Sequence, residues 1–217
     1  MAEEIFMDVI AVIGAIVAVT IAGWLSPGPS MVAVMSASLT NGRSHGISVG
    51  IGITLGNLFW LILALSGATL LFELFPTAVT VLKLVGASYL IWLGVKSLNS
   101  AASTKSDLKL SVVEDAGLRG SVKTGAIVAL TNPKAALFFG SVFATFVPVD
   151  ASLVLLVVIA VICSLQSAIQ HAVTAAVFST KPAVRFFSEF QRWINGIFGL
   201  LFVGMGASVA VSTMRNQ

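Results

Sequence analysis

The hydrophobic positions of this chain form six long runs, at residues 9–39, 46–72, 77–97, 121–147, 151–179 and 193–213. Each run has about the 20 apolar residues that an α-helix needs to cross the hydrocarbon core of a bilayer. The runs do not alternate in the roughly 10-residue units of a membrane β-barrel. Because a helix satisfies its own backbone in lipid, the pattern predicts an all-α, polytopic membrane protein of six transmembrane helices.

The composition supports a lipid environment. Hydrophobic residues make up 57% of the chain and charged residues 10%, whereas a soluble domain has roughly a quarter charged residues. Six spans and their loops account for nearly all of the 217 residues, so we expect a single transmembrane domain over 1–217. The single Cys163 excludes an internal disulfide. No metal site or cofactor is expected.

Basic residues are distributed unevenly among the loops. Nine of them follow the first, third and fifth runs: Arg43, Lys96, Lys105, Lys109, Arg119, Lys123, Lys181, Arg185 and Arg192. The other side holds only Arg215, with Lys83 close enough to reach it. The positive-inside rule therefore predicts that these three loops are cytoplasmic and that both termini lie outside. Membrane topology explains this charge better than nucleic-acid binding does.

The two halves of the chain resemble each other. Gly86-Ala-Ser-Tyr-Leu-Ile-Trp-Leu-Gly94 aligns with Gly196-Ile-Phe-Gly-Leu-Leu-Phe-Val-Gly204, and Ser26-Pro27 aligns with Asn132-Pro133. Each half has three spans, so the second half enters the membrane upside down, as in the inverted repeats of secondary transporters. We predict repeat one at about 1–97, a cytoplasmic linker at about 98–120 and repeat two at about 121–217. Chance similarity of apolar segments is the alternative.

Prolines interrupt the first and fourth runs. Run 9–39 is too long for one straight span, and Pro27 and Pro29 each remove a backbone donor from it. Ser26 before Pro27, and Asn132 before Pro133, are predicted N-caps followed by proline at the first helical position. Each break then presents a helix N-terminus, which suits a carboxylate. Kinks that serve packing alone are the alternative.

The predicted substrate site combines the two breaks with one further polar residue. It consists of Ser26, Pro27, Gly28, Pro29, Ser30, Asn57, Asn132, Pro133 and Lys134. A lysine inside an apolar run costs about 2.5–3.5 kcal/mol on insertion scales, which makes Lys134 a functional candidate; snorkelling to the surface is its alternative. No Asp or Glu lies well inside a run, so the substrate is expected to carry a carboxylate and an uncharged side chain.

Other polar residues in the runs are less specific. His171 is a candidate for carrying a coupled proton, because its ordinary pKa lies near neutrality; a packing role is the alternative. Gln166 and Gln170 share a helix face, either as cavity lining or as interhelical hydrogen bonds. Gly46, Gly50, Gly52 and Gly56 have the small-residue spacing of close helix packing.

Three motifs together resemble the LysE/RhtB amino-acid exporters: Ser-Pro-Gly-Pro at 26–29, the 86–94 segment, and Thr131-Asn132-Pro133-Lys134-Ala135. The similarity spans nearly the whole chain. It implies a bacterial inner-membrane exporter of amino acids, driven by the proton gradient, and leaves a homodimer open. Ser-Pro-Gly-Pro is similar to the homoserine/threonine branch; the Gly-Pro-Gln variant and intramembrane aspartates of the lysine and arginine branch are missing. The fifth run, with its Gln166, Gln170 and His171, departs from the family's pattern.

Three other functions compete with this interpretation. Export of another small metabolite or ion uses the same architecture, and a passive channel also uses broken helices, although the chain lacks charged rings or a filter loop. An intramembrane protease requires a dyad of Ser88 and His171, without any recognisable oxyanion hole. Zinc proteases are excluded because His-Glu-x-x-His is missing. We therefore expect a transporter and not an enzyme.

Overall fold

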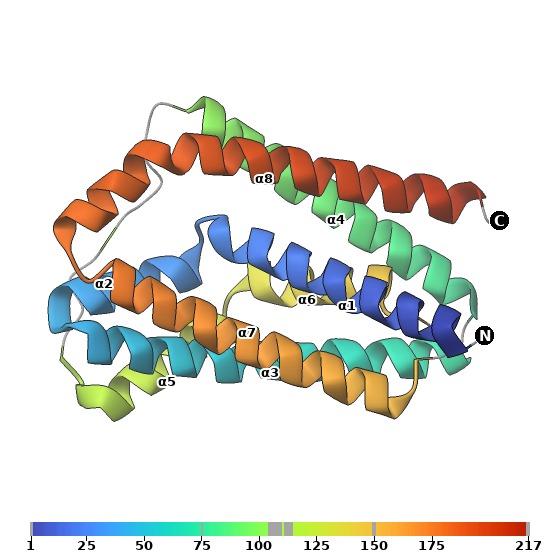
Figure 1. The fold of residues 1–217 in the computed structure, drawn as a ribbon, viewed down its shortest axis with the longest axis horizontal. Helices are drawn as coiled ribbons and strands as arrows, with labels where there is room; N and C mark the ends of the chain where they lie inside the picture. Colours follow the sequence, from blue (N-terminus) through green and yellow to red (C-terminus); the bar gives the residue numbers. More distant parts are fainter. Residues whose placement is uncertain (1, 75, 104–109, 111–114, 149–150, 216–217) are drawn as a thin grey trace.

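Helices make up almost all of the fold. A computed structural model describes residues 2–74, 76–103, 110, 115–148 and 151–215 (Figure 1). These residues contain no strand and eight helices: α1 (Ala2–Leu25), α2 (Pro29–Asn41), α3 (Arg43–Leu74), α4 (Pro76–Ala102), α5 (Gly117–Leu130), α6 (Pro133–Phe146), α7 (Leu153–Val177) and α8 (Lys181–Arg215). The predicted all-α class is confirmed.

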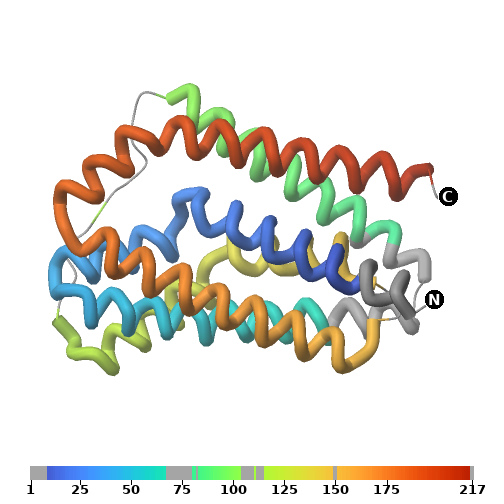
Figure 2. The backbone as a smooth tube through the Cα atoms, viewed as in Figure 1, coloured from blue at the N-terminus to red at the C-terminus, as the bar shows by residue number. Residues whose placement is uncertain are grey.

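Two helix pairs are single apolar segments broken near their middle. The α1–α2 pair bends by 57° and the α5–α6 pair by 60°, and Figure 2 shows both sharp turns of the backbone. This confirms that the first and fourth apolar runs are broken. In the described residues, α3, α7 and α8 are each long and apolar enough to cross a membrane, and each bent pair adds one more span if its two helices count together. The chain is therefore a polytopic membrane protein.

The two breaks start their second helices differently. Asn132 caps α6 as predicted, because its side-chain Oδ1 accepts a hydrogen bond from Lys134 N at 3.0 Å, with Pro133 at the first position. The predicted cap at Ser26 is wrong. Ser26 N still donates to Ala22 O at 3.1 Å, as in the last turn of α1. The extended Gly28 precedes α2 instead, and Pro29 occupies the first helical position.

The predicted boundary of the last helix is also wrong. Helix α8 begins at Lys181, twelve residues before the apolar run at 193, so Arg185 and Arg192 lie on helical turns and not in a loop. Phe187 and Gln191 of this segment are buried, which shows that an amphipathic first stretch extends the helix. Likewise α4 continues to Ala102 and α5 starts at Gly117. Residues 104–109 and 111–114 of the predicted linker, including Lys105 and Lys109, lie outside the described residues.

The connections gather at two ends of the molecule. Helix α1 begins and α8 ends at the same end as α6 ends and α7 begins, whereas α2 meets α3, and α7 meets α8, at the opposite end (Figure 1). At that opposite end Arg43 Nε donates to Ser179 Oγ at 2.9 Å, and His45 Nε2 lies 3.1 Å from Asp115 Oδ1. Two effects lower the pKa of the Asp115 carboxyl group. The larger is the hydrogen bond from the Gly117 backbone N–H, and the next is the charge of His45.

Glycines allow the helices to pack closely. A methyl group on Gly94 of α4 would lie 2.6 Å from the carbonyl oxygen of Gly199 on α8, so the two backbones are in contact there. On α3, Gly50 faces the His171 side chain of α7, and Gly52 faces the Val122 carbonyl of α5. Close helix packing is therefore the role of the α3 glycines.

Two apolar clusters lie on either side of the breaks. The larger one joins α1, α3, α4, α6, α7 and α8 around Leu61 and Phe143, toward the end where α1 begins. The smaller one joins α2, α3, α5 and α7 around Val34 and Ile53, toward the α2–α3 connection. The polar breaks thus lie between two clusters of packed apolar side chains.

Candidate functional site

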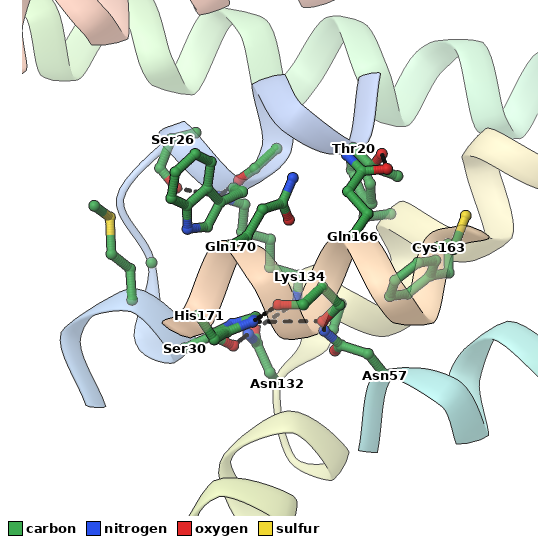
Figure 3. Close-up of a pocket in the computed structure, with 18 residues that line it drawn as sticks. Thr20, Ser26, Ser30, Asn57, Asn132, Lys134, Cys163, Gln166, Gln170 and His171 are labelled. Carbon is green, nitrogen blue, oxygen red and sulfur yellow. Dashed lines mark hydrogen bonds between the residues drawn. The ribbon is translucent and has the colours of Figure 1, made fainter. Parts of the chain in front are cut away.

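The two breaks open onto one cavity of about 100 Å³. This is several times the ~10–15 Å³ that one water molecule needs on the same measure. Its walls come from α1, α2, α3, α6, α7 and the breaks themselves, and Figure 3 shows them. The polar lining consists of Thr20, Ser26, Ser30, Asn57, Asn132, Lys134, Gln166, Ser167, Gln170 and His171.

The structure therefore brings most of the predicted site residues together. Ser26, Gly28, Ser30, Asn57, Asn132 and Lys134 all line the cavity, and so does His171. The three prolines of the predicted set, Pro27, Pro29 and Pro133, do not line it; they shape the backbone around it.

Lys134 joins the second break to the first. Its Nζ donates to Ser26 O at 2.9 Å and to Gly23 O at 3.4 Å. The helical donor for Gly23 O would be the N–H of residue 27, which is proline and has none. Lys134 therefore replaces a hydrogen bond that Pro27 removes, and its ammonium sits at the negative, C-terminal end of α1. It points inward and does not snorkel.

The ammonium of Lys134 retains capacity for a further partner. A lysine carries three N–H donors, and the two carbonyls account for two of them. Among the residues that the structure describes, no carboxylate pairs with this lysine; the ion pairs there join His45 to Asp115 and Arg185 to Glu189. The cavity thus holds a cation whose described partners are neutral.

A second contact ties the breaks directly. Asn132 Nδ2 donates to Ser30 Oγ at 3.3 Å while its Oδ1 caps α6. Gly28 lies beside the Lys134 side chain, where a methyl group on the glycine would be 3.5 Å from Nζ. Residues more than one hundred positions apart in the sequence therefore form one polar unit in the middle of the molecule.

Helix α7 supplies the opposite wall through Gln166, Ser167, Gln170 and His171. Gln166 accepts from Thr20 Oγ1 at 3.0 Å and donates to Val17 O at 3.1 Å, which links α7 to α1. Gln166 therefore both lines the cavity and makes an interhelical hydrogen bond. Gln170 differs, because its buried Nε2 has no hydrogen-bond partner in the structure.

His171 is held in a defined orientation. Its Nδ1 lies 2.6 Å from Ser167 O, and since a carbonyl can only accept, Nδ1 carries the hydrogen. In the neutral ring Nε2 is then the acceptor. Ser167 Oγ extends this network to Thr54 Oγ1 at 3.2 Å and Asn57 Nδ2 at 3.4 Å. Packing and proton chemistry are both compatible with this arrangement.

Several lining residues were not among the sequence predictions. Thr20 and Gly23 precede Ser26 by six and three residues, so helical spacing from the break places all three on one face. Trp24 and Cys163 gave no comparable signal.

Ser88 does not line the cavity; it is exposed on α4 and donates to Leu84 O at 2.8 Å, so it forms no dyad with His171. Within the described residues no group of three or more metal-ligating side chains occurs.

Comparison with known proteins agrees with this arrangement. The model of the LysE type translocator family matches residues 21–213. The chain is 31% identical over 196 residues to a threonine efflux protein of Salmonella typhi, and 29% identical over 195 residues to one of Escherichia coli K12; each match covers 89% of this chain and 95% of the relative. It is 29% identical over 189 residues to a leucine efflux protein of Enterobacter sp. strain 638, covering 86% of this chain and 89% of that protein.

No solved structure gives a significant match. The family match includes both breaks, Lys134 and the α7 wall. Relatives named for efflux also agree with a membrane-embedded polar cavity that contains no catalytic dyad. A transport function, and not an enzymatic one, follows: the chain belongs to the LysE type translocator family.

Proposed function

We propose that this chain is a secondary transporter that exports small amino acids with uncharged side chains, of the homoserine or threonine type, across a bacterial inner membrane. The observation that carries the proposal is the cavity in which Lys134 bridges two broken helices without a carboxylate partner among the described residues. The relatives named for threonine and leucine efflux support the same substrate class.

The substrate carboxylate binds at Lys134 and the N-terminus of α6. The third N–H of the ammonium and the positive end of the helix dipole both favour an anion there. The substrate ammonium binds Asn57, whose buried Oδ1 has no hydrogen-bond partner in the structure. An amino-acid zwitterion supplies both missing partners at once.

The side chain of the substrate is uncharged because the cavity has nothing to neutralise a second cation. None of its lining residues is an Asp or Glu. A lysine or arginine side chain would therefore bring an unpaired positive charge into a membrane-embedded site close to Lys134, which is costly.

Proton coupling is assigned to His171. The side chain is buried, lines the cavity and belongs to the Ser167 network that reaches Asn57. A proton taken up at Nε2 would therefore be felt at the group that holds the substrate ammonium. The link gives the proton gradient a direct route to substrate affinity.

We further propose six spans arranged as two inverted repeats, with α4 as the third span and both termini outside. Antiparallel packing of α4 against α8 and contact between the two breaks support a pseudo-two-fold arrangement. The glycines that match in sequence do not pack alike, since a methyl group on Gly94 would lie 2.6 Å from Gly199 O of α8, whereas one on Gly204 would meet no neighbouring atom within 4 Å. Fusions at the C-terminus test the orientation: an alkaline phosphatase reporter should be active and a cytoplasm-dependent one inactive.

The deciding experiment measures efflux of radiolabelled amino acids from loaded cells and uptake into inverted vesicles. Threonine, homoserine and leucine should leave faster than lysine or arginine, and a protonophore should stop movement against a gradient. Faster efflux of arginine than of threonine would contradict the proposed site. If amino acids moved only down their concentration gradient, at a rate that the protonophore did not change, the chain would be a channel.

A further inference from the structure

The side chain of Gln170 carries a buried polar atom of the cavity lining that neither the fold nor the proposed binding of the substrate backbone uses. The residue is only 9% exposed, and its Nε2 is buried without a hydrogen-bond partner. A buried amide donor that lacks an acceptor is costly, and native proteins keep few of them. Gln170 lines the cavity, so a ligand in that cavity is the natural source of the acceptor.

Gln166, one turn earlier on the same face of α7, provides an internal comparison. Its amide is satisfied at both ends, by Thr20 Oγ1 and Val17 O. The cavity wall thus contains two glutamines. Gln166 makes hydrogen bonds that join α7 to α1, whereas the Nε2 donor of Gln170 is unpaired. The two side chains have the same chemistry, yet the partly buried Gln166 is fully paired while the more deeply buried Gln170 is not, which argues against a purely structural role for Gln170.

The position of Gln170 separates it from the groups assigned to the substrate backbone. Figure 3 shows Gln170 near Ser26 and the Thr20–Gln166 pair, whereas Asn57 and Asn132 appear toward the opposite edge of the view. A zwitterion held at Lys134 and Asn57 can direct its side chain toward Gln170.

We propose that Gln170 determines specificity by donating a hydrogen bond from Nε2 to an acceptor on the substrate side chain. This inference rests on the proposed amino-acid export. The side chains that fit carry a hydroxyl or amide oxygen. An aliphatic side chain of equal size leaves the amide unpaired, and a site built to hydrogen-bond a hydroxyl discriminates strongly against an analogue that lacks it.

Threonine and valine test this directly, because they have nearly the same shape and differ by a hydroxyl in place of a methyl group. Efflux of both, and of alanine as a common reference, is measured for the wild-type chain, Gln170→Met and the matched control Gln166→Met. The wild type should prefer threonine over valine by about tenfold or more, and Gln170→Met should lower that ratio at least about fivefold. Gln166→Met should weaken export of all three amino acids while keeping the ratio within about twofold, because its amide serves the fold.

Each outcome decides a different point. No export of any amino acid by the wild-type chain would overturn the proposed function itself. Export with equal rates for threonine and valine would overturn only the role of Gln170. An equal loss of all three substrates in Gln170→Met, with normal amounts in the membrane, would also overturn it by placing Gln170 at the substrate backbone. If Gln170→Met does not accumulate, Gln170→Asn keeps the donor but withdraws it by one methylene, and should shift the ratio in the same direction.

Discussion

The two helix breaks have nearly the same shape but different chemistry. Both bend by about 60° and both continue into a helix that has proline at its first position. In the second break, Asn132 caps α6 with its own side chain. In the first, Gly28 precedes α2 without any side-chain cap. Equal geometry is thus reached with an internal cap in one half and without one in the other.

Each break also contains a backbone carbonyl that lacks its helical N–H donor because the residue four positions later is proline. These two carbonyls are paired differently. Pro133 leaves Ala129 O without its helical donor, and Trp60 Nε1 supplies one at 3.1 Å from α3, outside the cavity. Pro27 leaves Gly23 O without its donor, and Lys134 supplies that one from inside the cavity. The second break is therefore completed by a neutral side chain outside the cavity, whereas the first depends on a cation that a substrate can also bind. Ligand binding should act mainly on the first break.

Removing Lys134 should have the largest effect, because it takes away the cation at the site and the donor for Gly23 O together. Losing a charged hydrogen-bonding group of this kind costs about 1.5–3 kcal/mol, so we expect Lys134→Ala to reduce efflux by at least about tenfold and abolish net export. Insertion and expression should persist, as judged by immunoblot of membranes. Lys83→Ala, which changes a lysine outside the cavity, is the control. Normal efflux by Lys134→Ala would refute the shared site.

The sequence was sufficient to predict the helices and the existence of both breaks, because span length and proline act locally. It also predicted the cap at Asn132, which directly precedes the only proline of its run. It failed at Ser26, because two prolines lie two residues apart and only the backbone geometry shows that Pro29 starts the helix. The early start of α8 was missed because hydropathy alone defined that run, although Phe187 and Gln191 are buried on a helical face.

The site was predicted in part for a similar reason. Lys134 and the break residues stand out by their cost in lipid, so one sequence suffices to identify them. Their partners depend on tertiary contacts between distant helices: Trp60 on Ala129 O, and Thr20 on Gln166. The open donor of Gln170 is a contrast with Gln166 that no periodicity encodes, since both occupy the same face of α7.

Pro29 and Pro133 each occupy the first position of a helix, and replacing them should reduce efflux to different extents. The difference between the two breaks should be smaller than the effect of removing Lys134. Pro29→Ala and Pro133→Ala should both impair efflux, since each restores a donor that favours a continuous helix. The loss should be about fivefold greater for Pro29→Ala, because an Asn cap is worth about 1 kcal/mol and still starts α6 in the other variant. Initial efflux rates of threonine, normalised to protein in the membrane, give the comparison. A greater loss for Pro133→Ala would reverse the proposed order of dependence.

Trp60→Phe tests whether the second break is merely structural. The variant keeps an aromatic ring but removes the donor to Ala129 O, which should cost about 1 kcal/mol of stability and lower the melting temperature by about 2–4 °C. The substrate KM should stay the same, because Trp60 does not line the cavity. Thermal unfolding in detergent and efflux kinetics provide the two readouts. A changed KM without a change in melting temperature would show that this break also responds to substrate.

Gly28→Ala should have the smallest effect, although Gly28 lies in the first break and lines the cavity. Its φ of −161° is extended backbone that any residue can adopt, so alanine adds no conformational strain. The new methyl group would meet Lys134 Cδ at 3.4 Å and Nζ at 3.5 Å, which is ordinary van der Waals contact. Efflux should therefore remain within about twofold of wild type, whereas the bulkier Gly28→Val should displace the lysine and resemble Lys134→Ala. Because both variants change one position next to one side chain, their difference isolates the placement of the Lys134 ammonium. If Gly28→Ala alone abolished export, the substrate itself would have to occupy the space beside Gly28.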